Sequence, residues 1–134
     1  MEKAVIDAVK KSYGRALSNK NLMTDFYNKF IVSHPDVAKK FAGVDLQKQR
    51  EVLKQSLSMA ILFPQDNLIA KHAMERVYKT HGRNKLNISP ELYKYWLNSL
   101  VSVVAESDPE FTPELEQQWR LLLSQVIDYI KAGY

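Results

Sequence analysis

Two long stretches of this chain begin with the same local pattern. Ser89-Pro90-Glu91 and Thr112-Pro113-Glu114 each place a hydroxyl residue, a proline and an acid in succession. This order is typical of the N-cap, the first position and the first turn of a helix. Apolar residues then recur at helical spacing to about Glu106 and about Lys131. The inward residues predicted for the two helices are Tyr93, Trp96, Leu97, Leu100 and Val104, then Leu115, Trp119, Leu122, Val126 and Ile130.

The rest of the chain repeats the helical spacing and offers no convincing strand. Four glycines in 134 residues also leave little room for the turns of an all-β fold. We therefore predict a single all-α domain spanning residues 1–134. The further helices are predicted over residues 2–18, 20–33, 35–41, 45–64 and 68–81.

Composition excludes several classes of function. The chain has no cysteine, which excludes disulfides, thiolate metal sites and thiol catalysis. The net charge of +4 is spread along the chain and is a weak argument for nucleic acid binding. No apolar run approaches the roughly 18 residues of a membrane span, and the N-terminus has no apolar core of a signal peptide. A cytoplasmic protein without a membrane segment is therefore expected.

One histidine ends an otherwise apolar helical face. In the predicted helix over 68–81, Met74, Val77 and His81 share a face, whereas His72 lies on the opposite, charged face. An inward histidine is more often a hydrogen-bonded core residue than a metal ligand. On this helix alone, both interpretations of His81 stay open.

Two other polar side chains lie on predicted apolar faces. Tyr27 shares its face with Met23 and Phe30, so its hydroxyl enters the interior and needs a partner, ordinarily a backbone carbonyl. Gln49 lies on the same face as Leu53, where an unmade hydrogen bond costs about 1–3 kcal/mol. Either an internal group bonds the Gln49 amide, or Gln49 lies at the mouth of a pocket.

These features follow one another in an order that resembles the globins. FYNKFIVSHPDVAKKF is similar to the second and third helices of bacterial single-domain haemoglobins and flavohaemoglobins. FAGVDLQKQR is similar to the segment after the ring-stacking phenylalanine of truncated globins. The resemblance covers essentially the whole chain. The full first helix and the lack of the paired glycines typical of truncated globins imply the ordinary globin fold, a three-over-three helical sandwich around a haem pocket.

The resemblance implies a site for haem b (iron protoporphyrin IX). His81 matches the proximal ligand of the iron, and Phe41 matches the phenylalanine that packs on the haem face. Tyr27 matches the distal tyrosine of many bacterial globins, and Gln49 matches the distal-helix residue that faces a bound ligand. The apolar walls expected around the haem are Phe41, Leu53, Met74, Val77, Ile88 and Leu97.

Tyr93 resembles the tyrosine that supports the proximal histidine in flavohaemoglobins. The carboxylate that would complete this support has no clear match, because Asp128 is shifted by several positions. A peroxidase-like role is therefore not favoured. Near His81, five basic residues face only Glu75, which predicts a solvated basic face from which some could pair with haem propionates: Lys71, Arg76, Lys79, Arg83 and Lys85.

The function implied by the resemblance is reversible binding of dioxygen at ferrous iron, as in bacterial haemoglobins. Such binding would serve oxygen transport. Carbon monoxide and nitric oxide would bind at the same place. One alternative is a nitric-oxide dioxygenase, which would need a separate reductase because the chain carries no flavin or nicotinamide domain. A haem-based gas sensor that acts through a partner chain and a helical domain without a cofactor are further alternatives.

Overall fold

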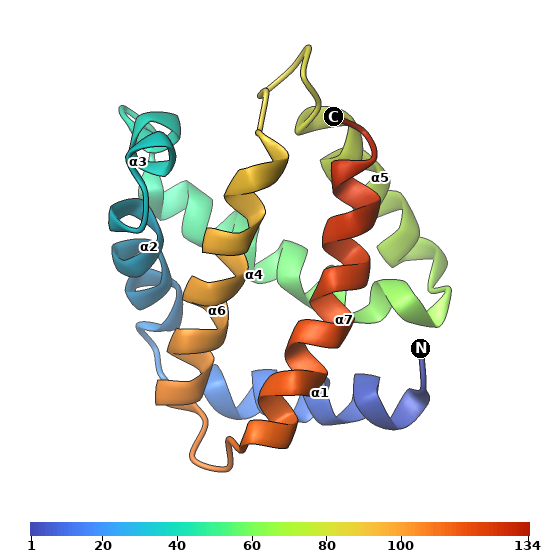
Figure 1. Ribbon diagram of the computed structural model, residues 1–134. Coiled ribbons are helices and arrows are strands. Elements are labelled where there is room, and N and C mark those ends of the chain that lie inside the picture. The colour runs from blue at the N-terminus through green and yellow to red at the C-terminus, as the bar shows by residue number, and fades with distance from the viewer.

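The computed structural model describes all residues from Met1 to Tyr134 and contains helices without any strand (Figure 1). The predicted all-α class is confirmed. The helices are α1 (Lys3–Ala16), α2 (Leu22–Val32), α3 (Pro35–Phe41), α4 (Leu46–Leu62), α5 (Leu68–Thr80), α6 (Tyr93–Ser107) and α7 (Pro113–Lys131). Two short 3₁₀ turns, η1 (Phe63–Gln65) and η2 (Pro90–Leu92), follow α4 and precede α6.

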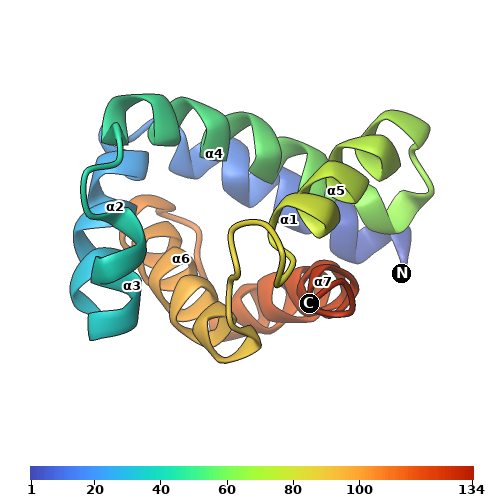
Figure 2. The same cartoon turned by 90° about the horizontal axis from the view of Figure 1, so that it is seen from above.

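The helices pack in two layers of three. Figure 2 shows α1, α4 and α5 in one layer, and α2, α6 and α7 in the other. This arrangement confirms the predicted three-over-three sandwich. The segment between α5 and α6 lies at the same end of the molecule as α3, whereas α1 runs across the opposite end (Figures 1 and 2).

Most helix starts follow the expected local chemistry. The Asp45 carboxylate accepts a hydrogen bond from the Lys48 amide at 3.3 Å, and the Thr112 hydroxyl accepts one from the Leu115 amide at 3.1 Å. The N-cap expected at Ser89 is wrong. Its side chain caps nothing, because η2 intervenes and the amide of Leu92 bonds the main-chain carbonyl of Ser89 at 3.0 Å. Helix α6 therefore begins only after this turn.

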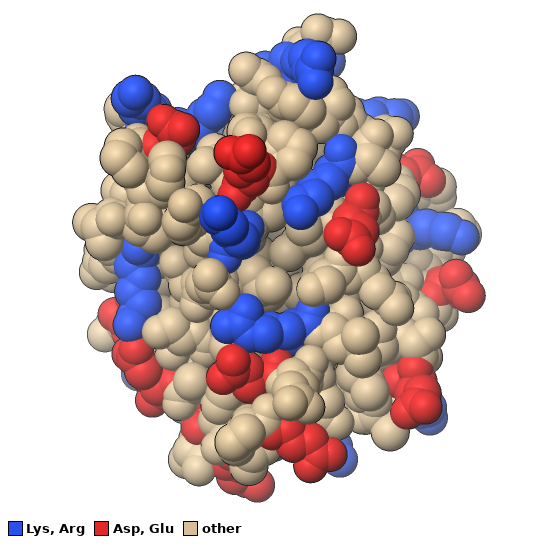
Figure 3. All heavy atoms as spheres, in the orientation of Figure 1, with Lys and Arg blue, Asp and Glu red and all other residues tan.

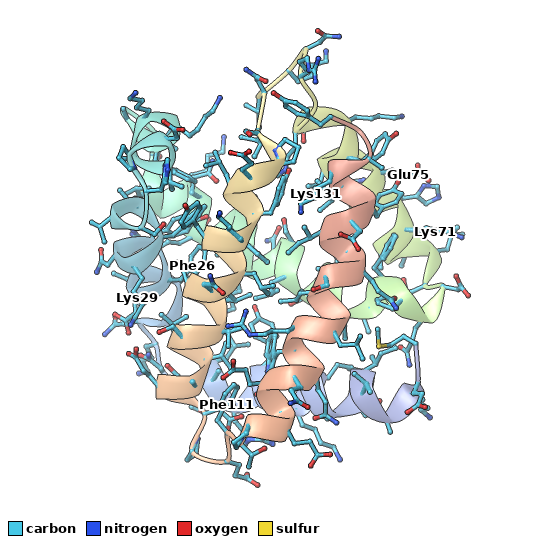
Figure 4. The ribbon with its side chains drawn as sticks, in the orientation of Figure 1. Phe26, Lys29, Lys71, Glu75, Phe111 and Lys131 are labelled. Atoms are coloured by element: carbon cyan, nitrogen blue, oxygen red, sulfur yellow. The ribbon has the colours of Figure 1, made fainter.

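The core is built from the predicted apolar stripes. Every inward residue predicted for α7 is buried, and Trp119 is fully covered. In α2 the ring of Phe26 lies toward α6 (Figure 4), with its centroid 6.1 Å from that of Trp96 in an edge-on arrangement. Edge-to-face pairs of this kind add to the stabilisation from burying the rings.

A buried polar network joins the two layers where α1 meets the turn between α6 and α7. The Asp108 carboxylate accepts hydrogen bonds from the Ser12 hydroxyl at 2.6 Å and from Arg15 at 2.6 and 3.0 Å. The indole N–H of Trp119 donates to the Ser12 oxygen at 2.9 Å. We call these four residues the corner network. The sequence Asp108-Pro109 predicts the end of a helix. The second role of Asp108, as the acceptor in the corner network, depends on residues about a hundred positions earlier in the chain.

No helix of the structure combines the length and the apolar character needed to cross a membrane.

Candidate functional site

His81 is the residue that ends α5. Its amide donates to the Val77 carbonyl at 2.9 Å, so the backbone completes the last helical turn before the chain leaves the helix. The imidazole is half-buried, and this burial lowers the pKa of His81 below its ordinary value. A lowered pKa favours the neutral ring at neutral pH, which is the form that binds metals.

Tyr93 fixes the orientation of this imidazole. The Nδ1 atom of His81 lies 3.2 Å from the hydroxyl oxygen of Tyr93, on the first residue of α6. Burial raises the pKa of Tyr93 to about 12, so the phenol stays protonated. When Nδ1–H donates to this oxygen, the lone pair of Nε2 is free for a ligand, and Nε2 has no hydrogen-bond partner in the protein. The likeness of Tyr93 to a proximal-histidine support thus has a geometric counterpart.

No carboxylate completes a relay behind this pair. Asp128 is exposed on α7, and Asp108, the one buried carboxylate, belongs to the corner network. No cluster of three or more His, Asp or Glu side chains is placed to hold a bare metal ion. A haem requires only one protein ligand, so the site has the donor set of a haem site and lacks that of a protein-only metal site.

Tyr27, Phe41 and Gln49 come together between α2, α3 and α4. The Tyr27 hydroxyl donates to the main-chain carbonyl of Gln49 at 3.3 Å, the ordinary kind of partner for an inward tyrosine. The Tyr27 and Phe41 rings meet edge-on with centroids 5.5 Å apart. Burial raises the pKa of Tyr27 to about 12, although the charge of Arg50 opposes this rise, so the hydroxyl remains a donor.

Gln49 lies at the boundary between interior and solvent. Its side chain is half-buried, and its amide makes no hydrogen bond to another protein group. No polar side-chain atom that is fully buried lacks a partner anywhere in the protein. Of the two alternatives for Gln49, the structure therefore favours a position at the edge of the interior, where solvent or a ligand can bond its amide.

The predicted apolar walls divide into two groups. Leu53 and Met74 are buried, whereas Phe41, Val77, Ile88 and Leu97 are half-buried although they pack against the core. These half-covered side chains come from α3, α5, the segment after α5 and α6. Incompletely covered apolar side chains on several elements are what a flat apolar ligand would cover. The residues present therefore fit a haem.

The match to a family model decides the classification. The model named Globin matches residues 24–130, which include all nine residues predicted to form the site. The chain belongs to the globin family. The globin family and fold indicate a haem-binding protein that binds a gaseous ligand such as oxygen.

A solved structure supports this membership over almost the whole length. The chain is 32% identical to a crystallised protein from Pseudomonas aeruginosa PAO1, described as structurally highly homologous to a human hemoglobin. The TM-score is 0.92, and the match covers 97% of this globin and 98% of the other chain. A comparison with curated proteins gave no match.

One feature of the site could not be foreseen in the sequence. Arg50 is half-buried and makes neither an ion pair nor a hydrogen bond, yet its charge acts on Tyr27. The sequence gives no signal for this, because the position of a long side chain beside α2 depends on how α2 and α4 cross.

Proposed function

We propose that this globin holds haem b through His81 and binds dioxygen reversibly on the side of Tyr27. The observation that carries the proposal is the His81–Tyr93 pair, in which a half-buried neutral imidazole has one nitrogen engaged at 3.2 Å and the other free. The haem, when bound, supplies a ferrous iron with one open position for a diatomic gas.

Each of these side chains would have a distinct role in binding the haem or the gas. His81 supplies the nitrogen ligand, and Tyr93 holds the plane of its ring. Phe41, Val77, Ile88 and Leu97 would cover the haem faces and exclude water, which protects a ferrous state from oxidation. Tyr27 would donate a hydrogen bond to the gas, and Gln49, at the edge of the site, would add a second. A phenol and an amide favour dioxygen over carbon monoxide, because dioxygen acquires more negative charge on binding.

Reversible binding is supported better than peroxidase chemistry. A carboxylate hydrogen-bonded behind a proximal histidine raises its basicity as a ligand. Here the hydroxyl of Tyr93 is the group that faces Nδ1, and Asp128 lies exposed on α7. His81 therefore acts as a neutral donor. Dioxygenation of nitric oxide stays the alternative, since it needs the same gas site and an external reductase.

An absorption spectrum of the purified protein, reconstituted with haemin, tests the proposal. We expect an intense Soret band, a mainly five-coordinate ferrous form without ligand, and a reversible shift on oxygenation. His72 is exposed on the charged face of α5, and His34 caps α3 and lies against the Tyr95 ring, so neither should reach the iron. Absence of the Soret band, or a low-spin six-coordinate ferrous form at neutral pH, would contradict the proposed site.

The same preparation tests the nitric-oxide dioxygenase alternative. Any oxygenated ferrous haem would consume one equivalent of nitric oxide, so the distinguishing result is rapid and continuous consumption of nitric oxide once a reductase and an electron donor are added. Rapid oxidation by molecular oxygen in the absence of nitric oxide, within the time of a binding cycle, would argue against a role in reversible oxygen binding.

A further inference from the structure

The charges of this globin are distributed unevenly. Residues 35–50 and 71–94 together contain ten Lys and Arg against four Asp and Glu, whereas the rest of the chain contains nine against eleven. In Figure 3, Lys and Arg atoms lie at the tip of the molecule and at its upper left edge. This end of the molecule carries α3 and the segment after α5. That segment follows His81 directly in the chain.

Four cations at this end lie on α3 and on the segment after α5, and this segment also carries an exposed apolar side chain. Lys39, Lys40, Arg83 and Lys85 are exposed, and Leu86 is 56% exposed. We call these five residues the basic rim. The ammonium group of Lys40 donates to the Leu86 carbonyl at 3.1 Å, which brings α3 beside the segment after α5. Lys39 has only Asp36 nearby, at 4.0 Å, and Lys85 has no ion-pair partner. Their charges are therefore available to another molecule.

The segment that carries the basic rim is held in place by its own hydrogen bonds. The Leu86 amide donates to the Thr80 carbonyl at 3.0 Å, and the Ile88 amide donates to the His81 carbonyl at 3.1 Å. Tyr134 holds the other side, since its hydroxyl donates to the Asn87 side chain at 2.9 Å and its ring lies 4.6 Å below the Arg83 guanidinium. A surface that is already ordered loses little entropy on binding.

The expected solvated basic face near His81 is also present. Lys71, Arg76 and Lys79 are exposed, and Figure 4 shows Lys71 on the outer side of α5. These cations extend the positive potential from the basic rim along α5. An extended potential of one sign speeds encounter with an oppositely charged partner.

We propose that the basic rim is the docking surface for a small acidic electron-transfer protein that reduces this globin. The proposal rests on the proposed haem at His81. In the step, one electron passes from the reduced carrier to ferric haem iron, which becomes ferrous, while the carrier is oxidised by one electron and no atom is transferred. The segment that would lie beneath the partner is hydrogen-bonded to the His81 backbone, through the Ile88 amide and the His81 carbonyl.

A protein fits this surface better than an anionic membrane. Leu86 is the single large apolar side chain exposed on the segment between α5 and α6, and one leucine offers little area for insertion among lipids. Several exposed charges beside a small exposed apolar area are instead typical of transient protein interfaces, where charge gives orientation and speed.

Binding to oxidised flavodoxin, a small acidic carrier that is redox-inert in this state, tests the docking surface without any turnover. We expect titration calorimetry at low salt to detect binding that weakens steeply between about 10 and 200 mM salt. The double variant Lys39→Glu/Lys85→Glu should weaken binding by about 10-fold or more at low salt. Both side chains are exposed and make no contact that positions the segment, so the fold is not at risk.

The matched control is Lys10→Glu/Lys20→Glu. It changes the net charge by the same amount, but its residues are exposed on and just after α1, at the opposite end of the molecule (Figure 1). It should weaken binding by less than about 3-fold, through the general change of charge alone. Leu86→Ser should weaken binding several-fold while leaving the salt dependence unchanged.

Reduction kinetics give the second readout. Flavodoxin hydroquinone should reduce the ferric wild type at a rate that falls with salt and with the rim variant, whereas the final extent of reduction by excess dithionite should be equal in all variants. Equal binding of the rim and control variants would overturn the docking surface, as would stronger binding to phosphatidylglycerol vesicles than to flavodoxin. A missing Soret band with rim-dependent binding intact would refute the haem site and leave the docking surface standing.

Discussion

The corner network and the proposed haem site both contain polar groups in an apolar surrounding, but they differ in how tightly those groups are bonded. Asp108 is wholly covered at its side chain and accepts bonds of 2.6, 2.6 and 3.0 Å. Tyr27 bonds its acceptor at 3.3 Å, and His81 lies 3.2 Å from Tyr93. Trp119 of the corner network is fully buried, whereas Phe41, Val77, Ile88 and Leu97 among the predicted haem walls are half-covered.

We interpret this difference as one between residues that stabilise the fold and residues that the proposed function assigns to ligand binding. A short bond to a buried charge is costly to break, because it leaves an uncompensated group behind. A long bond to a neutral carbonyl can be exchanged for a bond to a ligand at little cost. Substitutions in the two regions should therefore change different quantities. Those in the corner network should change stability, and those in the site should change ligand binding.

The largest effect expected at the site comes from His81→Ala. Removal of the sole nitrogen ligand on the apolar face of α5 should abolish stable haem binding, or yield a protein whose Soret band is restored by added imidazole. The control, His72→Ala, should leave the spectrum unchanged, since His72 is exposed and lies near Glu75. Haem lost from the His72 variant and kept by the His81 variant would reverse the assignment.

At the corner, Asp108→Ala should lower the free energy of unfolding of the apoprotein by about 3 kcal/mol. Ser12 and the partly covered Arg15 would lose their acceptor in the interior. Denaturant titration measures the change, and the oxygen dissociation rate of the haem-loaded variant should stay within about 2-fold of the wild type. Glu110→Ala, which removes an exposed carboxylate 3.5 Å from Arg15, is the control and should cost less than about 1 kcal/mol.

The Asp108 carboxylate should also make the corner network sensitive to acid. Burial opposes its ionisation, but hydrogen bonds from Arg15 and Ser12 outweigh burial and lower the pKa of Asp108. The unfolded chain therefore binds the proton more readily, so the stabilisation is present above about pH 4 and is lost as the pH falls through the folded-state pKa. Asp108→Asn should flatten the decline of stability between about pH 5 and pH 2. An unchanged pH profile would show that the carboxylate is not the group being titrated.

The smallest of the expected effects tests the exchangeable bond. Tyr27→Phe should speed oxygen dissociation by about 10-fold, which corresponds to the loss of about 1.4 kcal/mol. The Tyr27 ring is held by Phe26 and Phe41, with centroids 5.0 and 5.5 Å away, so the hydroxyl is positioned in advance. Gln49→Leu should change the rate less, because a half-exposed amide with three rotatable bonds loses more entropy on bonding a ligand.

Stopped-flow dissociation rates for the two variants decide between the donors, with carbon monoxide as the internal control because it should respond weakly to either change. A larger effect at Gln49, or none at Tyr27, would mean that the phenol keeps its bond to the Gln49 carbonyl when a gas is present.

The sequence predicts the fold well because each helix carries its own signal. Apolar spacing and the capping residues Asp45 and Thr112 place most boundaries within a residue or two of the structure. The 3₁₀ turns were missed, since proline after Ser89 is compatible with either kind of helical turn. The corner network was also missed: Ser12, three residues after Val9 on the apolar stripe of α1, was its one local sign.

The site is predicted less completely than the fold. Resemblance supplies the candidate residues, and the structure brings Tyr27, Phe41 and Gln49 together and sets His81 beside Tyr93. It does not decide which acceptor Tyr27 uses with a gas present, so the roles of these residues stay predictions. Acceptor choice depends on distances of a few tenths of an ångström between helices, and residue spacing along a chain carries no such information.

The distances along the chain between the hydrogen-bonded residues have a consequence for folding during synthesis on the ribosome. Tyr27 and Gln49 are 22 residues apart and His81 and Tyr93 are 12 apart, whereas Ser12 and Trp119 are 107 apart. Closing a long loop is entropically more demanding than closing a short one, so the contacts between α1 and α7 form late. All nine residues proposed to form the haem site have been synthesised before Trp119 exists. We therefore expect the proposed cofactor to be held durably only after α7 has left the exit tunnel and has packed against α1.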